Sequence, residues 1–221
     1  MLNTLKDSGF EAYLVGGCVR DMLLGLTPLD YDITTSATPE QIKLCFERTI
    51  DTGIKHGTVT VILDKTPIEV TTFRTEGDYN DSRRPENVTF VTDINKDLSR
   101  RDFTVNAIAY NPETGFVDPF YGMEDIKRKT LRAVGNPQKR FSEDALRIMR
   151  LFRFASVLGF TIEEDTKNAA INCADALQKI SVERIYTELK KLCIGKYIHL
   201  AKPLFESGAL NFLGFDSLEK T

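Results

Sequence analysis

The sequence predicts an α+β protein in which a mixed α/β domain precedes an all-helical one. Runs rich in β-branched residues alternate with helical runs over roughly the first 135 residues. After about residue 136 there is no strand pattern, and four helical runs follow, at residues 142–158, 163–178, 181–194 and 197–207. This change of pattern predicts one domain over residues 1–135 and a second over residues 136–221.

Local signals place the elements of the first domain. The run EAYLV predicts a strand, and Gly16-Gly17 then leads into a short helix, VRDMLL, that Gly25 ends. Thr38 and Pro39 are typical of a helix N-cap and of the first helical position. The runs TVTVIL and PIEVTTF, separated by DKT, predict a β-hairpin.

Two further segments are predicted from composition and caps. Residues 76–87 are polar and lack an apolar period, so we expect a loop there. In the second domain, Ser142 with Glu143 and Asp144 predicts the start of the first helix, and Ser181 predicts the start of the third.

Composition narrows the class of protein. The chain has 221 residues, is 42% hydrophobic and carries a net charge of −3. Its start does not resemble a signal peptide, and no apolar run has the length of a membrane span, so we expect no membrane partner. The four cysteines include no C-x-x-C pair, which argues against a zinc site or a disulfide framework. Free thiols are typical of a reducing compartment, and the sequence predicts a cytoplasmic protein.

The run LDYDITTSA, at residues 29–37, raises the first chemical question. Side chains alternate along a strand, so Asp30 and Asp32 would point to the same side, about 6–7 Å apart at the backbone. Carboxylates that close repel one another unless a cation lies between them. The alternative is a solvated face of an edge strand.

The run VGGCVRD lies about a dozen residues earlier. Glycines at a strand-to-helix junction allow a ligand to approach the backbone, and Arg20 adds a bidentate donor for phosphate. The run matches neither a P-loop nor a dinucleotide-binding fingerprint. A tight turn without a ligand is the alternative.

A third carboxylate comes from PIEVTTF. Ile68 and Val70 share one face of this predicted strand, so Glu69 lies on the other. If the strand neighbours the one that carries Asp32, Glu69 joins both aspartates. Three carboxylates that hold two Mg²⁺ ions are suited to in-line phosphoryl transfer. A solvated strand face is again the alternative.

The run SEDALRIMRLFRFASVLG predicts a buried helix, because apolar residues surround its axis almost completely. Four charged residues lie within it at spacings of three: Asp144, Arg147, Arg150 and Arg153. Buried arginines without partners are costly, and one aspartate cannot neutralise three of them, whereas a bound triphosphate could. By contrast, the run LSRRDFTVNAIAYNP contributes Arg100, Arg101, Asp102 and Asn106, whose spacing alone indicates no more than a structural ion pair.

In this order, the motifs resemble those of class II CCA-adding enzymes and bacterial poly(A) polymerases, nucleotidyltransferases of the polymerase-β superfamily. The resemblance runs from residue 11 to about 195. It is carried by GGCVRDMLLG, LDYDITTSA, KHGTVTVIL, IEVTTFRTEGDY, RRPENVTF, RRDFTVNAIAYNP and EDALRIMRLFRF. It implies a small mixed-sheet catalytic head with flanking helices over residues 1–135, followed by an all-α neck.

The resemblance also implies site residues. The metal-binding and catalytic carboxylates would be Asp30, Asp32 and Glu69, with Mg²⁺ as the cofactor. The nucleotide-binding residues would be Gly17, Arg20, Arg101, Asp144, Arg147, Arg150 and Arg153, of which Asp144 and Arg147 resemble the pair that selects the base.

The implied activity is template-independent addition of C, C and A to the tRNA 3′ end from CTP and ATP. KHGTVTV and the complete EGDYNDSRRPENV loop resemble the tRNA enzymes more than the poly(A) polymerases. A-adding enzymes, poly(A) polymerases and a non-catalytic nucleotide-binding module remain as alternatives. Family members continue beyond the neck into body and tail domains that hold tRNA, so we expect weak tRNA binding by this chain. The sequence gives no oligomeric state.

Overall fold

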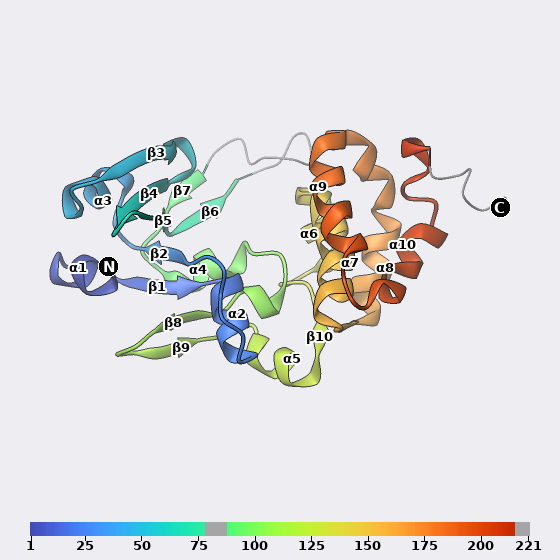
Figure 1. Ribbon diagram of the computed structural model, residues 1–221, viewed down its shortest axis with the longest axis horizontal. Helices are drawn as coiled ribbons and strands as arrows, with labels where there is room; N and C mark the ends of the chain where they lie inside the picture. Colours follow the sequence, from blue (N-terminus) through green and yellow to red (C-terminus); the bar gives the residue numbers. More distant parts are fainter. Residues whose placement is uncertain (78–87, 215–221) are drawn as a thin grey trace. The chain divides into compact units, whose positions relative to one another are not determined.

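The computed structural model describes residues 1–77 and 88–214 (Figure 1). The chain divides into two compact units. The first comprises Met1–Gly77 and the described residues that follow as far as Ile126, and the second continues from Lys127. Each unit is described by itself below. In the described chain no helix combines the length and the apolar character that a membrane crossing requires.

A seven-stranded mixed sheet organises the first unit, with strands in the order β3-β4-β5-β2-β1-β8-β9. Strands β2 and β5 pair in parallel, and every other neighbouring pair is antiparallel. The strands are β1 (Ala12–Val15), β2 (Asp32–Thr35), β3 (Thr49–Gly53), β4 (Thr58–Leu63), β5 (Thr66–Thr72), β8 (Ala109–Asn111) and β9 (Gly115–Val117). A separate antiparallel pair is formed by β6 (Arg74–Glu76) and β7 (Val88–Phe90).

Short helices accompany the sheet: α1 (Leu2–Asp7), α2 (Gly17–Leu23), α3 (Pro39–Cys45), α4 (Ile94–Ser99) and α5 (Gly122–Arg128). Leu5 of α1 and Ile42 of α3 belong to one buried apolar cluster with residues of β1, β2, β4 and β5. These two helices therefore cover one face of the sheet. The period of two leaves polar side chains on the opposite face, as Glu69 is exposed while Val70 is fully buried.

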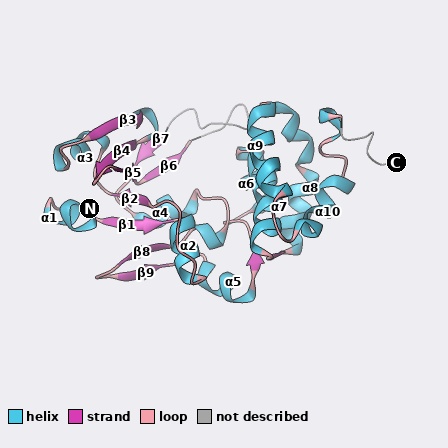
Figure 2. Cartoon of the chain, viewed as in Figure 1, coloured by secondary structure: helices cyan, strands magenta, loops and turns pink. Residues whose placement is uncertain are grey.

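The second unit is built mainly from helices (Figure 2). They are α6 (Pro137–Glu143), α7 (Leu146–Leu158), α8 (Glu164–Asn172), α9 (Val182–Cys193) and α10 (Lys202–Glu206), with 3₁₀ turns at Ala174–Lys179, Ile198–Ala201 and Asn211–Leu213. As predicted, α7 is buried almost all round, including the fully buried Ile148, Met149 and Phe152. It is the central helix of this unit.

Several predicted elements are confirmed. The first strand, the hairpin of β4 and β5, and the helix that opens at Pro39 all form. Thr38 is the N-cap of α3, and its hydroxyl accepts a hydrogen bond from the Gln41 backbone at 3.4 Å. The Gln41 side chain accepts one from the Thr38 backbone at 2.8 Å, which completes a capping box.

The predicted start of the helix over residues 142–158 is wrong. The segment consists of two helices, because Asp144 has extended backbone angles (φ −136°, ψ 102°) and ends α6. Ser142 lies inside α6, where its hydroxyl donates to the Lys139 carbonyl at 2.8 Å, so it does not cap a helix. Ser181 is the N-cap residue of α9, but its side chain makes no capping hydrogen bond.

Two other expectations need correction. The second unit does contain strands, since β11 (Thr161–Ile162) pairs in parallel with β10 (Thr130–Leu131). Strands of two residues are too short to produce a recognisable period. The expected loop over residues 76–87 falls mostly on residues 78–87, which lie outside the described residues, and Glu76 ends strand β6.

The cap of α3 allows a test of this part of the fold. We expect Thr38→Ala to lower the free energy of unfolding by about 1 kcal/mol, because one backbone N–H loses its partner. Thr38→Ser retains the hydroxyl and is the matched control, with a change of less than about 0.5 kcal/mol. Urea unfolding of the three chains measures both values. Equal losses in the two variants would show that the methyl group matters more than the cap.

Candidate active site

Two carboxylates meet on the polar face of the sheet. Asp32 is the first residue of β2 and lies in register with Glu69 of the parallel strand β5. Residues paired in this way point to the same face. The condition for bringing Glu69 to Asp32, that their strands are neighbours, is therefore met.

Asp30 is placed differently from the prediction. It lies in a bend before β2 rather than on the strand, because β2 begins at Asp32, where pairing with β5 starts. Asp30 is exposed to solvent. Its charge nevertheless reaches Asp32 and contributes to the electrostatics of that carboxylate.

The pKa of Asp32 is raised above its usual range. Burial of the carboxylate by surrounding protein atoms is the largest cause, followed by the negative charges of Asp30 and Glu69, while Arg101 acts in the opposite direction. Asp32 as a whole residue is still exposed, so its carboxylate is crowded rather than sealed from water. This concentration of negative charge favours a bound cation.

Oxygen donors of this kind suit a hard divalent cation. In the described residues, however, no group of three or more His, Cys, Asp or Glu side chains is arranged so that it could hold a metal ion. Asp30, Asp32 and Glu69 thus lie in the same region and are all acidic. Their side chains would have to turn toward one another to bind one ion. The donor set fits a divalent cation chemically.

The glycine turn, Asp32 and Arg101 come together at one point. Gly16 has φ +78° and is the N-cap residue of α2, with Gly17 as the first residue of the helix. A Cβ atom on Gly16 would lie 3.3 Å from Arg101 Nη1 and 3.9 Å from Asp32 Oδ2. Glycine at position 16 therefore provides both the backbone conformation and the close approach.

Arg20 is buried and bound within the protein. Its Nη1 donates to Asn106 Oδ1 at 2.7 Å, and its Nε and Nη2 donate to Asp21 Oδ1 at 2.9 and 2.7 Å. Asn106 in turn donates to Asp102 Oδ1 at 3.0 Å. Arg20 thus joins α2 to the 3₁₀ turn Thr104–Asn106, and contact with phosphate would have to coexist with these bonds.

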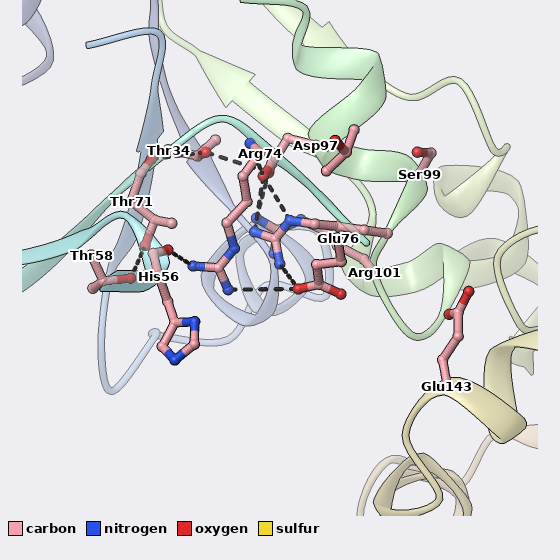
Figure 3. A network of polar contacts seen from close by, with 12 residues as sticks. Thr34, His56, Thr58, Thr71, Arg74, Glu76, Asp97, Ser99, Arg101 and Glu143 are labelled. Carbon is pink, nitrogen blue, oxygen red and sulfur yellow. Dashed lines mark hydrogen bonds and ion pairs between the residues drawn. The ribbon is translucent and has the colours of Figure 1, made fainter. Parts of the chain in front are cut away.

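Asp97, within α4, binds both arginines of the RRD run (Figure 3). Arg100 lies 2.9 Å from Asp97 Oδ1, and Arg101 Nη2 donates to Asp97 Oδ2 at 3.1 Å. Burial alone would raise the pKa of Asp97, but the two guanidinium groups and the hydrogen bonds that it accepts lower it. Ion pairing of these arginines, expected with their neighbours in the run LSRRDFTVNAIAYNP, thus includes Asp97, the residue just before that run.

In the second unit, Asp144 and Arg147 have different immediate partners. Asp144 lies between α6 and α7, accepts from the Leu146 backbone at 3.1 Å and faces Arg184 of α9 at 3.8 Å. Burial raises the pKa of Asp144, and Arg184 is the strongest opposing influence. Arg147 is buried in the first turn of α7 and donates to Glu143 Oε2 at 2.9 Å. The expectation that Asp144 and Arg147 share one continuous helix is wrong, although Arg147 lies close enough to lower the pKa of Asp144.

The expectation that Asp144 is the one carboxylate available to the arginines of α7 is also wrong. Glu143 pairs with Arg147, and Glu188 of α9 lies 2.9 Å from Arg153 Nε. Arg150 and Arg153 also lie against the Phe154 ring, at 5.3 and 4.1 Å from its centroid. Described carboxylates of this unit thus pair with Arg147 and Arg153.

Sequence reasoning assigned no site role to Asp97, Glu143, Arg184 or Glu188. Arg184 and Glu188 are four residues apart in an ordinary amphipathic helix, a pattern that predicts no particular partner. The local signals were the spacings of four from Asp97 to Arg101 and from Glu143 to Arg147, since residues so spaced are neighbours where a helix continues.

Two family models and several named relatives match this chain. The model of the poly(A) polymerase head domain matches residues 12–132, and that of the probable RNA- and SrmB-binding site of polymerase A matches residues 159–215. The CCA-adding enzyme of Lactobacillus helveticus is 54% identical over 205 residues, which cover 93% of this chain and 51% of the relative. That of Geobacillus kaustophilus is 51% identical over 95% of this chain and 52% of the relative.

Solved structures give the same result. The Bacillus stearothermophilus CCA-adding enzyme in complex with CTP superimposes with a TM-score of 0.86 at 47% identity, over 94% of this chain and 51% of the other. The Thermotoga maritima CCA-adding enzyme complexed with tRNA has a TM-score of 0.72 at 28% identity, over 97% and 49%. The chain spans about half the length of the relatives that it matches. It belongs to the family of CCA-adding enzymes and bacterial poly(A) polymerases that is defined by the poly(A) polymerase head domain.

Proposed function

We propose that this chain adds C, C and A from CTP and ATP to the 3′ end of tRNA without a nucleic-acid template. The observation that carries the proposal is the in-register pair of Asp32 and Glu69, beside Arg101 and the Gly16 turn. Relatives about half identical to this chain are CCA-adding enzymes. Because the chain spans only half of their length, its activity, substrates and tRNA partner belong to the proposal.

The first unit would serve as the catalytic head and the helical unit as the neck. Asp30, Asp32 and Glu69 would hold Mg²⁺, which lowers the pKa of an attacking hydroxyl and neutralises the triphosphate in reactions of this class. Arg101 and Gly17 would bind the nucleotide phosphates or sugar, with Arg20 fixing the turn. All four cysteines are free thiols, which supports a cytoplasmic location.

Base selection would depend on Asp144 and Arg147, with Arg150 and Arg153 as further nucleotide contacts. Cytosine and adenine each present an amine beside an unprotonated ring nitrogen. A carboxylate can accept from the amine while a guanidinium donates to the nitrogen. Uracil and guanine present a carbonyl and an N–H at these positions, so both contacts would be lost.

A transfer assay tests the proposal against its alternatives. Labelled CTP and ATP are offered to tRNA that ends before the CCA sequence, after its first C or after its second C. A CCA-adding enzyme extends all three, and an A-adding enzyme extends only the last. A poly(A) polymerase adds runs of A, and a binding module adds nothing. Any of the last three results would replace the proposed function.

Asp32→Asn should abolish transfer and yet stabilise the fold near neutral pH. The raised pKa of Asp32 means that the folded carboxyl binds its proton more tightly than the unfolded one. The free energy of unfolding therefore falls as pH rises from the ordinary aspartate range through the raised value. Asparagine does not ionise, so the Asp32→Asn protein does not lose this part of the free energy of unfolding as pH rises.

Urea unfolding at several pH values, together with the transfer assay, measures both effects. Asp7→Asn, at an exposed aspartate of α1, is the matched control and should leave both properties unchanged. An Asp32→Asn protein that kept more than a few per cent of wild-type transfer, or was less stable than wild type at pH 7, would contradict the role of Asp32.

Asp144→Ala and Arg147→Ala should narrow the preference for CTP and ATP over UTP and GTP. Unpaired polar groups at a selective site cost about 1–3 kcal/mol each, so the loss should be about tenfold to a few hundredfold. Asp165→Ala, at an exposed aspartate of α8, is the matched control. Competition among the four nucleotides in the transfer assay measures selectivity. If both variants lost stability but kept wild-type selectivity, a purely structural role would stand instead.

A further inference from the structure

Asp97 is a fully buried carboxylate that the proposed chemistry does not use. It lies in α4, and the groups around it come from separate segments of the first unit: Thr34 in β2, Arg74 in β6, and Arg100 and Arg101 after α4 (Figure 3). A buried charge is tolerated only when it is paired and hydrogen-bonded. Asp97 meets that condition through each of its two oxygens.

The two oxygens of Asp97 serve different partners. Oδ1 accepts from the Arg74 backbone N–H at 3.2 Å and from Arg100 Nε at 2.9 Å. Arg100 Nη1 also donates to Glu76 Oε1 at 2.9 Å. This side ties α4 to β6 and does not involve the carboxylates at Asp32 and Glu69.

Oδ2 faces Arg101 and β2. It accepts from Arg101 Nη2 at 3.1 Å and lies 3.4 Å from the Thr34 hydroxyl. Thr34 follows Asp32 by two residues on the same strand, so both side chains are on one face of the sheet. Asp97 therefore fixes Arg101 relative to the strand that carries Asp32.

Arg101 Nη1 lies beside the glycine turn. Nη1 is 3.3 Å from the point where a Gly16 side chain would begin. Nε is buried and has no hydrogen-bond partner in the described chain. Three guanidinium groups, of Arg74, Arg100 and Arg101, are clustered with the two carboxylates of Glu76 and Asp97.

We propose that Asp97 is a positioning residue that holds the Arg101 guanidinium, through Nη2, with Nη1 turned toward a nucleotide bound at the Gly16 turn. The inference rests on the proposed function, whose nucleotide it orients. Asp97 itself touches no substrate. A guanidinium that is already held in place loses less conformational freedom when it binds an anion, so the loss of Asp97 weakens nucleotide binding.

A purely structural role for Asp97 is the competing explanation, and Glu76 provides the matched control. Both acids pair with Arg100, and Asp97 is fully buried while Glu76 is partly buried. Asp97 also pairs with Arg101, whereas Glu76 lies 3.6 Å from Arg74. Asp97→Asn and Glu76→Gln each convert an acid into its amide within one network. A structural role would reduce stability in both variants without separating their nucleotide affinities.

The experiment is calorimetric titration of CTP with Mg²⁺ into the wild-type chain, Asp97→Asn, Glu76→Gln, Arg101→Ala and the double variant Asp97→Asn/Arg101→Ala. Asp97→Asn should weaken CTP binding about tenfold to a hundredfold, the range for a hydrogen bond to a charged group. Glu76→Gln should stay within about threefold of wild type. The double variant should bind CTP no more weakly than Arg101→Ala alone, because Asp97 acts through Arg101.

Wild-type affinity in Asp97→Asn, equal losses in Asp97→Asn and Glu76→Gln, or additive losses in the double variant would each overturn the assignment. If Asp97→Asn does not fold, NMR of the guanidinium N–H groups of the wild-type chain replaces it. CTP must then shift the Arg101 Nε–H signal more than that of Arg100, and the reverse order would overturn the assignment. A wild-type chain that binds no CTP would overturn the proposed function as well, and the wild-type titration alone reveals this.

Discussion

The rest of the site depends on the parallel pairing of β2 with β5. This pairing sets Asp32 opposite Glu69 and, two residues later, Thr34 opposite Thr71. The other face of the same strands carries Ile33 and Val70, which are buried against α1 and α3. A slip of one residue would turn the carboxylates into the core and the apolar side chains into solvent, so the hydrophobic core fixes the register of the polar face.

That register places like charges together at a cost to stability. Asp32 has a raised pKa because protein atoms, Asp30 and Glu69 all disfavour its charged form, and Arg101 compensates only in part. Sites for cations and phosphates commonly hold such unfavourable charge clusters within a rigid structural frame. Here the frame includes Gly16, whose missing side chain admits Arg101, and the buried Asp97, which holds Arg101 from behind.

Features that depend on neighbouring residues were predictable from the sequence. The capping box at Thr38 and the hairpin of β4 and β5 are examples, since both depend on interactions between residues a few positions apart. Strand alternation is also local, and it put Glu69 on the face opposite Val70, but it misplaced Asp30, which precedes β2. What the sequence could not show was long-range pairing, such as Glu188 against Arg153 or Arg184 against Asp144, because nothing in the α9 run distinguishes these residues from solvated ones. The short strands β3, β8 and β9 were also not predicted, because three to five residues give little periodicity.

The pairing of the α7 arginines changes how a nucleotide would bind to them. Because Glu143 already accepts from Arg147, a base that takes a hydrogen bond from Arg147 competes with an existing ion pair or adds to it through another N–H. The net gain in affinity is then small, since one charge-assisted bond replaces another. Discrimination is different, because a wrong base would disturb the pair without offering a matching acceptor. An arginine that is held by a neighbouring carboxylate thus contributes more to selectivity than to affinity, and this is what a site that accepts both CTP and ATP but rejects UTP and GTP requires.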